Sequence, residues 1–363
     1  GTQNVSVGFN LYTNTTGDFN TAVGFRSLYL NATTDSNTAI GHEALYNNVA
    51  AGNTAVGKDA LNANTTGTEN VAMGMDALKT NTTTGRNTAV GYASLTANVA
   101  ANNTGVGYGA LNANTTGAGN IAVGSGAMEI NTTGTRNIAI GMNAYNSSDT
   151  ENDNIAIGFD AMTTNTAGGT ANVAVGNYAL DALTSGDANV AVGDNALSAN
   201  NSGGSNTSIG HESLAANTTA SNNTAVGKGS LTANTTGDAN VAIGFESMIT
   251  NTTGTDNTAI GKESLKANTT GTNNTALGRQ ALFSNTTGDS NVAVGLNSLK
   301  LNTTGTRNIA IGQSAYQNSD TENDNVAIGH NAMNTNTAGG TGNVAVGNYA
   351  GDAITSGDYN TCL

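Results

Sequence analysis

A pattern of five residues recurs along the whole chain: asparagine, a β-branched residue, alanine, an aliphatic residue and glycine. Residues 137–141 and 154–158 are two examples. The leading asparagine returns after 16, 17 or 18 residues, and nearly always after 17. A short period kept over a whole chain is the signature of a repeat protein, in which each repeat packs only on its neighbours. We number the positions of each repeat from this asparagine.

The alternation within these five residues predicts a short β-strand. Positions two and four are β-branched or aliphatic, as in Thr54 and Val56, and position three is small, as in Ala55. Alternate residues of a strand face opposite sides, so positions two and four share one face. The residue types on both faces are restricted: one face has bulky side chains, and the other has only small ones, as if a neighbouring surface lay close to it. This fits a strand that lies between a thin interior and another surface.

The rest of the repeat contains a second apolar pair and a turn. Ala60 and Leu61 predict a second short strand, and the Asn-Thr-Thr-Gly of residues 64–67 has the composition of a turn. No helix of ten residues fits between such turns, and a period of 17 does not match helical periodicity. The sequence therefore predicts an all-β fold: a parallel β-solenoid, or β-roll, of about 21 coils with a 17-residue repeat.

Stacked coils place identical residues above one another, about 4.8 Å apart. We expect the position-one asparagines to form a ladder of side-chain amides, each donating to the next coil. Position-twelve asparagines such as Asn64 predict a second ladder. The expected structural ladder consists of Asn53, Asn70, Asn137, Asn154, Asn223 and Asn240, with the position-five glycines Gly57, Gly74, Gly141, Gly158, Gly227 and Gly244.

The sequence also has a second, longer period. Residues 131–141 are identical to residues 302–312, an offset of 171 residues or ten coils. The position-twelve asparagine is replaced by Ser148 and Leu183, and again by Ser319 and Ile354. Duplication of a ten-coil block explains this, and the match is clearest between about 103–189 and 274–360. We expect residues 1–363 to form a single continuous solenoid of 16–18-residue coils.

Composition narrows the classes of partner. The chain has 11 Lys and Arg against 25 Asp and Glu, a net charge of −14, so no nucleic-acid partner is expected. No apolar run approaches a membrane span, so no direct membrane insertion is expected. The single cysteine, Cys362, stands at the alanine position and is interpreted as a packed residue. The chain starts and stops within the repeat pattern, and we therefore expect it to be a segment of a longer protein.

The phrase Asn-x-Ala-[Val/Ile]-Gly, repeated between glycine-rich turns, resembles the head repeats of trimeric autotransporter adhesins, and related repeats occur in phage tail-fibre proteins. The resemblance covers the whole chain, although the adhesin-head coil is shorter than 17 residues. It implies a left-handed β-roll with three copies side by side, exposed on a bacterial cell surface or a virion. Independently, each coil has only two or three large apolar side chains, so burying a second face against copies of itself favours a homo-oligomer.

Two acidic turns are candidates for calcium binding, since calcium takes carboxylate and amide oxygens. They contain Asp149, Glu151 and Asp153, and then Asp320, Glu322 and Asp324. Neither matches an EF-hand loop or a nonapeptide calcium repeat. A solvated acidic turn is the favoured interpretation, and no cofactor is expected.

Position six contains three histidines and a series of aromatic residues. His42, His211 and His330 are ten and seven coils apart, so they cannot share a metal or a triad. The aromatic residues are Phe9, Phe25, Tyr92, Tyr108, Phe159 and Phe245. They fit either glycan binding or packing between subunits, and the second is slightly favoured. No catalytic residues are identified, and the chain is not expected to be an enzyme.

The sequence thus predicts a structural and adhesive fibre segment, extracellular on a bacterial surface or virion. Its expected partners are its own copies, as a homotrimer, and a host-surface glycan or protein. Alternatives are the receptor-binding shaft of a phage tail fibre, a self-stacking extracellular filament and a polysaccharide-degrading tailspike. An ice-binding solenoid is a further alternative, but position two is often Val or Ile and the Thr pairs lie in turns.

Overall fold

The computed structural model describes residues 1–166, 168–335 and 339–363. Over these residues the chain has 22 short strands and no helix, and it forms a parallel β-solenoid of about 21 turns. The predicted fold class and the 17-residue repeat are confirmed. The chain divides into two compact units, Gly1–Ser185 and Gly186–Leu363, and each is a stack of coils with one strand per coil.

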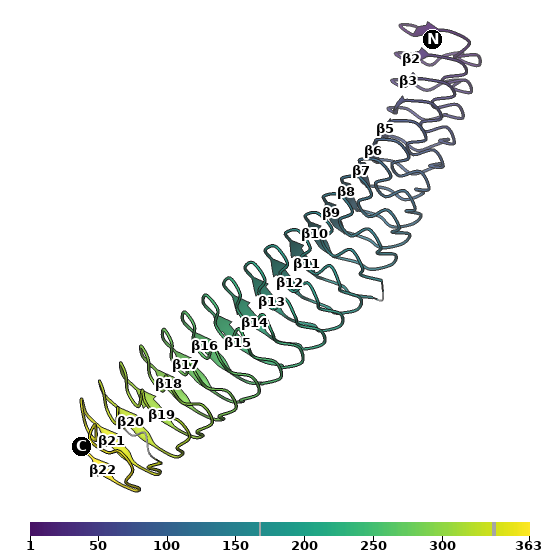
Figure 1. Cartoon of the computed structure of the whole chain (residues 1–363). Coiled ribbons are helices and arrows are strands. Elements are labelled where there is room, and N and C mark those ends of the chain that lie inside the picture. Colours follow the sequence, from purple (N-terminus) through teal and green to yellow (C-terminus); the bar gives the residue numbers. More distant parts are fainter. Residues whose placement is uncertain (167, 336–338) are drawn as a thin grey trace. The chain divides into compact units, whose positions relative to one another are not determined.

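The strands follow one another in chain order within each unit (Figure 1). The first unit contains β1 (Val5–Val7), β2 (Thr21–Val23), β3 (Thr38–Ile40), β4 (Thr54–Val56), β5 (Val71–Met73), β6 (Thr88–Val90), β7 (Thr104–Val106), β8 (Ile121–Val123), β9 (Ile138–Ile140), β10 (Ile155–Ile157) and β11 (Val173–Val175). The second contains β12 (Val190–Val192), β13 (Thr207–Ile209), β14 (Thr224–Val226), β15 (Val241–Ile243), β16 (Thr258–Ile260), β17 (Thr275–Leu277), β18 (Val292–Val294), β19 (Ile309–Ile311), β20 (Val326–Ile328), β21 (Val344–Val346) and β22 (Thr361–Cys362).

Neighbouring strands pair in parallel, with a register of one whole coil. Ala242 of β15 lies opposite Ala259 of β16, which lies opposite Ala276 of β17. The repeat length equals the coil length, so each position stacks on its own counterpart. This register gives both units continuous rows of like residues, inside and outside.

The alanine at position three faces the interior, and its two strand neighbours face outward. Ala55, Ala122 and Ala242 are fully buried, whereas Ile243 is 36% exposed. The sequence left open which face of the strand is the inner one. On the strand side the buried leucine of the opposite wall leaves room only for the small side chain, so the β-branched residues at positions two and four lie on the outer surface.

The opposite wall of the coil is a turn, so the prediction of a second strand at Ala60 and Leu61 is wrong. Leu61 is buried but has φ 50°, and Asp59 has φ 58°. Left-handed conformation costs about 1–2 kcal/mol for a residue with a Cβ. Burying a leucine contributes about 1.5–3 kcal/mol, and the Leu61 N–H donates to Ala77 O of the next coil at 3.0 Å. Together these offset the backbone strain.

In the coils that begin at Asn37, Asn53 and Asn154, coil length is set in the turn that follows position twelve. In the 17-residue coil, Asn64 Nδ2 donates to the carbonyl three residues on, at 3.0 Å. In the 16-residue coil, Asn48 reaches the carbonyl two residues on, at 2.6 Å. In the 18-residue coil, Asn165 reaches the carbonyl four residues on, at 2.8 Å. The same side-chain contact closes all three turns, so the change in length leaves the stacking intact.

Position five is glycine because the backbones of neighbouring coils approach closely there. A Cβ atom on Gly227 would lie 2.5 Å from the carbonyl oxygen of Gly244 in the next coil. This contact leaves no space for a side chain. The same conformation, with φ between +127° and +144°, occurs at Gly57, Gly74, Gly141, Gly158, Gly227 and Gly244.

We predict that Gly227→Ala lowers the unfolding free energy of the second unit by at least about 2 kcal/mol, because it combines backbone strain with a clash. Gly229→Ala, in the same coil, is the matched control. Gly229 has φ +66°, and a Cβ there would meet no atom nearer than 3.6 Å. It should cost only the strain of a left-handed residue, about 1–2 kcal/mol, and so less than Gly227→Ala, which adds a clash. Urea unfolding followed by circular dichroism measures both, and equal midpoints would contradict the close approach at position five.

Candidate functional site

The position-one asparagines connect the coils from the inside. The Asn240 N–H donates to Asn223 Oδ1 of the preceding coil at 2.9 Å, and Asn240 Nδ2 donates to Gly254 O at 2.8 Å. The recurrent coil-to-coil bond therefore runs from a backbone N–H to a side-chain oxygen, and the predicted amide-to-amide contact occurs beside it in some coils, as from Asn257 Nδ2 to Asn240 Oδ1 at 3.2 Å. The same pair of bonds is made by Asn53, Asn70, Asn137, Asn154 and Asn223.

The position-twelve asparagines form the amide-to-amide ladder. Asn268 Nδ2 donates to Asn251 Oδ1 at 2.7 Å, and Asn251 Nδ2 donates to Asn234 Oδ1 at 2.9 Å. These side chains are fully buried. The Asn-Thr-Thr triplets match the acceptor sequence for N-glycosylation. Because the amide groups of these asparagines lie inside the coil, they are inaccessible to modification in the folded chain.

The second ladder is interrupted where position twelve is not asparagine. Asn131 Oδ1 and Asn165 Oδ1 are buried and accept no hydrogen bond, because Ser148 and Leu183 occupy position twelve of the next coils. Tyr145 partly compensates for the interruption at Ser148. Its hydroxyl oxygen accepts from Asn154 Nδ2 at 2.6 Å and from Asn165 Nδ2 at 3.2 Å. Tyr316 accepts from Asn325 in the same way at 2.7 Å.

The three carboxylates of the first acidic turn have three separate environments. Glu151 is 2% exposed and accepts the N–H groups of Asp149 and Thr150, each at 3.0 Å, and that of Gly168 at 3.1 Å. Asp153 lies on the surface and accepts two hydrogen bonds from Arg136, at 2.6 and 2.7 Å, which lower the pKa of its carboxyl. Asp149 accepts from the hydroxyl of Thr132. These carboxylates do not converge on one calcium position.

The second acidic turn repeats this arrangement. Glu322 accepts the N–H groups of Asp320, Thr321 and Gly339 at 2.7, 3.1 and 3.1 Å. Asp324 is bound by Arg307 at 2.6 and 2.8 Å. Sequence reasoning missed the burial of the two glutamates. The available signal was that Glu151 and Glu322 stand at position fifteen, which elsewhere is usually glycine.

His42, Glu43 and Asp59 are the only group of three or more potential metal ligands brought together in the described part of the chain. Their ligand atoms lie within 4.8 Å of one another. However, Lys79 lies 3.4 Å and Lys58 3.9 Å from Asp59, and Glu43 is also ion-paired, with an arginine. These cations compete with a metal ion for the same oxygens, so the group is a surface ion-pair network.

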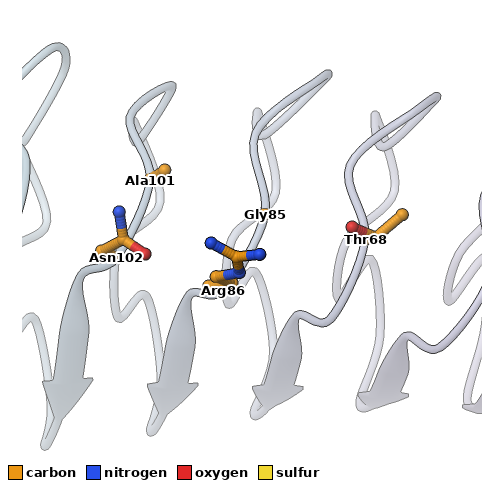
Figure 2. A pocket seen from close by; sticks show the side chains of 5 residues that line it. All are labelled: Thr68, Gly85, Arg86, Ala101 and Asn102. Atoms are coloured by element: carbon orange, nitrogen blue, oxygen red, sulfur yellow. The ribbon is translucent and has the colours of Figure 1, made fainter.

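A shallow pocket of about 180 Å³ lies between neighbouring coils of the first unit. Figure 2 shows its lining on the segments that lead into β5, β6 and β7. It is lined by Thr68, Gly85, Arg86, Ala101 and Asn102. Arg86 Nε is already paired with a glutamate at 3.0 Å. Typical ligand pockets hold about 300–1,000 Å³, so this hollow is small and offers no unpaired charge.

The largest unpartnered feature is the outer face of the sheet, formed by positions two and four of each strand. None of the strand residues is charged. The exposed side chains at position four of the second unit are Ile209, Ile243, Leu277, Ile311 and Val346. With 11 strands in each unit, each face is roughly 50 Å long. Position two is threonine in ten of the 22 strands, so the face is uncharged and partly apolar, and it is a candidate interaction surface.

The position-six aromatic residues stack on residues of neighbouring coils. Phe9 lies 5.9 Å from Phe25, which lies 5.4 Å from the His42 ring, and Tyr92 lies 5.3 Å from Tyr108. Phe159 meets Tyr178 edge-on at 5.4 Å. In the stacked pairs, each ring covers part of a face of its neighbour, which leaves less ring face for a sugar. This arrangement agrees better with packing between subunits than with a glycan platform.

Comparison with known proteins does not assign the chain to a family. No family model matches the chain, and no curated protein matches it. Across the described residues, no helix has the length and apolar character that crossing a membrane requires. The basis for a functional assignment is therefore the solenoid fold and its exposed face.

We predict that stability falls steeply in alkali because of two buried tyrosines. Burial raises the pKa of Tyr145 and of Tyr316, and the nearby glutamate raises each further. An unfolded tyrosine titrates near pH 10. Above about pH 10 the unfolded chain loses the proton while the folded chain keeps it. The unfolding free energy then falls by about 1.4 kcal/mol per pH unit for each buried tyrosine, and below about pH 10 the contribution is fully present.

Urea unfolding between about pH 9 and 11 measures this slope. Tyr145→Phe should be less stable at neutral pH, since Asn154 loses an acceptor, but its decline in alkali should be shallower. Tyr108→Phe is the control, because Tyr108 is 62% exposed, and it should decline like the wild type. An unchanged slope in Tyr145→Phe would contradict the assignment.

Proposed function

We propose that this chain is a non-catalytic fibre segment with structural and adhesive roles, displayed on a bacterial cell surface or a phage virion and assembled as a homotrimer. The observation that supports it most is the uncharged outer face of the sheet. Ile243 and Leu277 are 36% and 45% exposed on it in the isolated chain. Burying such side chains contributes about 25 cal/mol per Å² of apolar surface.

A second copy of the same chain is the partner that this face fits best. Along the face, the side chains at positions two and four repeat once per coil. The same face of a second copy therefore has the same spacing between side chains and the same width. The face has no charges that would need partners on the other side. The number of copies, three, comes from the resemblance to adhesin-head repeats.

The repeat also supports an adhesive role. A stack of similar coils presents similar surface groups at regular intervals, so weak contacts with a host-surface glycan or protein add up through avidity. A non-catalytic role is supported by the titratable groups, because the clustered carboxylates already have partners inside the chain, as at Glu151 and Asp153.

Light scattering tests the assembly. The wild type should form one particle with a mass near three times the 36.0 kDa of a single chain. The double variant Ile243→Lys and Leu277→Lys should dissociate towards single chains, because it places charges in the buried face. Thr253→Lys is the control, on an exposed turn, and should keep the mass of the wild type.

A wild type of single-chain mass at micromolar concentration would overturn the homotrimer. A particle that grows with concentration would instead favour the self-stacking filament.

A further inference from the structure

Most cations of this chain are ion-paired within it. The chain has 11 Lys and Arg residues, and a carboxylate lies within 4.0 Å of seven of them. In the first unit, every cation is paired. The seven are Arg26, Lys58, Lys79, Arg86, Arg136, Lys266 and Arg307.

The remaining four cations lie together in the second unit. They are Lys228, Lys262, Arg279 and Lys300. Among the described residues no carboxylate lies within 4.0 Å of them, and Lys262 has a longer-range electrostatic interaction with Glu263. All four fall in the five successive coils that begin with β14 to β18 (Figure 1). In a chain with a net charge of −14, four cations that lack an ion-pair partner and lie in one region form a local positive field that attracts an anionic partner.

These four residues occupy one edge of the coils. Lys228, Lys262 and Arg279 stand at position six, and Lys300 stands at position ten. Positions six and ten are neighbours, as Phe9 and Tyr29 show in the first unit, with ring centroids 5.9 Å apart. One coil advances about 4.8 Å, so the cations follow a line of roughly 20 Å along the stack. We call these four residues the basic strip.

Two phenylalanines lie within the strip and hold its lysines. Lys262 Nζ lies 5.5 Å from the centre of the Phe245 ring. The Phe283 ring has Lys266 at 5.7 Å and Lys300 at 5.9 Å. Cation–π contacts restrict the lysine side chains without neutralising them. Lys262 and Lys300 of the strip are thus restricted by ring contacts and still charged.

The local charge of this edge is positive. Its two carboxylates, Glu246 and Glu263, both bind Lys266, at 2.7 and 3.1 Å. Five cations against two carboxylates leave a net charge of +3. The negative overall charge, from which no nucleic-acid partner was expected, is therefore not uniform, and this edge is positive.

We propose that the basic strip binds an anionic polysaccharide through its carboxylate or sulfate groups. Cations on a line match a linear polyanion better than a planar lipid surface. A single-stranded nucleic acid would also need free aromatic faces for its bases, and lysine ammonium groups lie over the faces of Phe245 and Phe283. The proposal names a ligand for the adhesive part of the proposed function and does not depend on the homotrimer.

Calorimetry tests the proposal by measuring the binding of the wild-type chain to heparin, to alginate and to neutral dextran. Heparin presents sulfates, alginate presents only carboxylates, and dextran presents neither. We expect binding to at least one of the two anionic polymers, weaker at high salt because of screening, and none to dextran. Binding to dextran as strong as to either anionic polymer would overturn the proposal, and so would a lack of binding to both anionic polymers.

Two matched quadruple variants locate the site. Lys228→Gln, Lys262→Gln, Arg279→Gln and Lys300→Gln together remove the strip and should weaken binding at least about tenfold. Lys58→Gln, Arg86→Gln, Arg136→Gln and Arg307→Gln remove the same charge from ion-paired sites and should leave binding within about twofold. Equal losses in both variants would show a general charge effect and overturn the strip as the site.

Further measurements separate the alternatives. Tighter binding to single-stranded oligothymidine, or to vesicles with anionic lipid, than to either polysaccharide would overturn the ligand class. Light scattering on both quadruple variants should give the wild-type mass, because the strip lies off the apolar face. If the wild type proves not to be trimeric and yet binds heparin or alginate through the strip, the assembly fails and the ligand assignment stands.

Discussion

Every side chain in this solenoid stacks on its own counterpart about 4.8 Å away, and this constraint governs the rest of the structure. Inside the coil, a residue is acceptable only if it tolerates a copy of itself above and below. Asparagine meets this condition because its amide both donates and accepts, as Asn251 does between Asn234 and Asn268. Alanine meets this condition because its side chain is small, and glycine meets it because the absence of a side chain lets the backbones of neighbouring coils approach closely. The interior is therefore repetitive: alanine lines the strand side, asparagines occupy positions one and twelve, and a buried Leu, Met or Tyr stands at position nine, while the β-branched strand residues lie outside.

The same constraint shapes the outer surface. Like charges in neighbouring coils repel one another, and ion pairs between coils offset this repulsion, as in Arg136 and Asp153 or Arg307 and Asp324. Uncharged residues stack on their counterparts without such repulsion, both on the outer face of the sheet and in the row of Tyr12, Tyr29 and Tyr46. Against this pattern the unpaired Lys228, Lys262 and Arg279 stand out as the departure that intramolecular stacking does not explain.

Much of the fold was predictable, because a pattern repeated in every coil averages out local ambiguity. The strand, the glycine after it and the turn could be predicted because β-branched residues favour strands, and Gly and Asn-Thr-Thr-Gly favour turns. The left-handed turn at Asp59 and Leu61 was not predictable, since an apolar pair favours a strand by propensity alone and only tertiary packing stabilises the strained conformation. Nor was the direction of the alanine, because two restricted faces look alike in sequence. The interaction surfaces were harder still, since ion pairing depends on which coils are neighbours.

The central claim is that the alanine faces inward and that the residues beside it form a surface that other copies cover. Disulfide trapping tests it directly, with Ile243→Cys in a Cys362→Ala background. Mild oxidation should produce covalently linked pairs of chains, because position-four side chains of different copies meet across the interface. Thr253→Cys in the same background should remain single, since that turn faces solvent. Equal cross-linking in the two variants, or none at Ile243→Cys, would contradict the account.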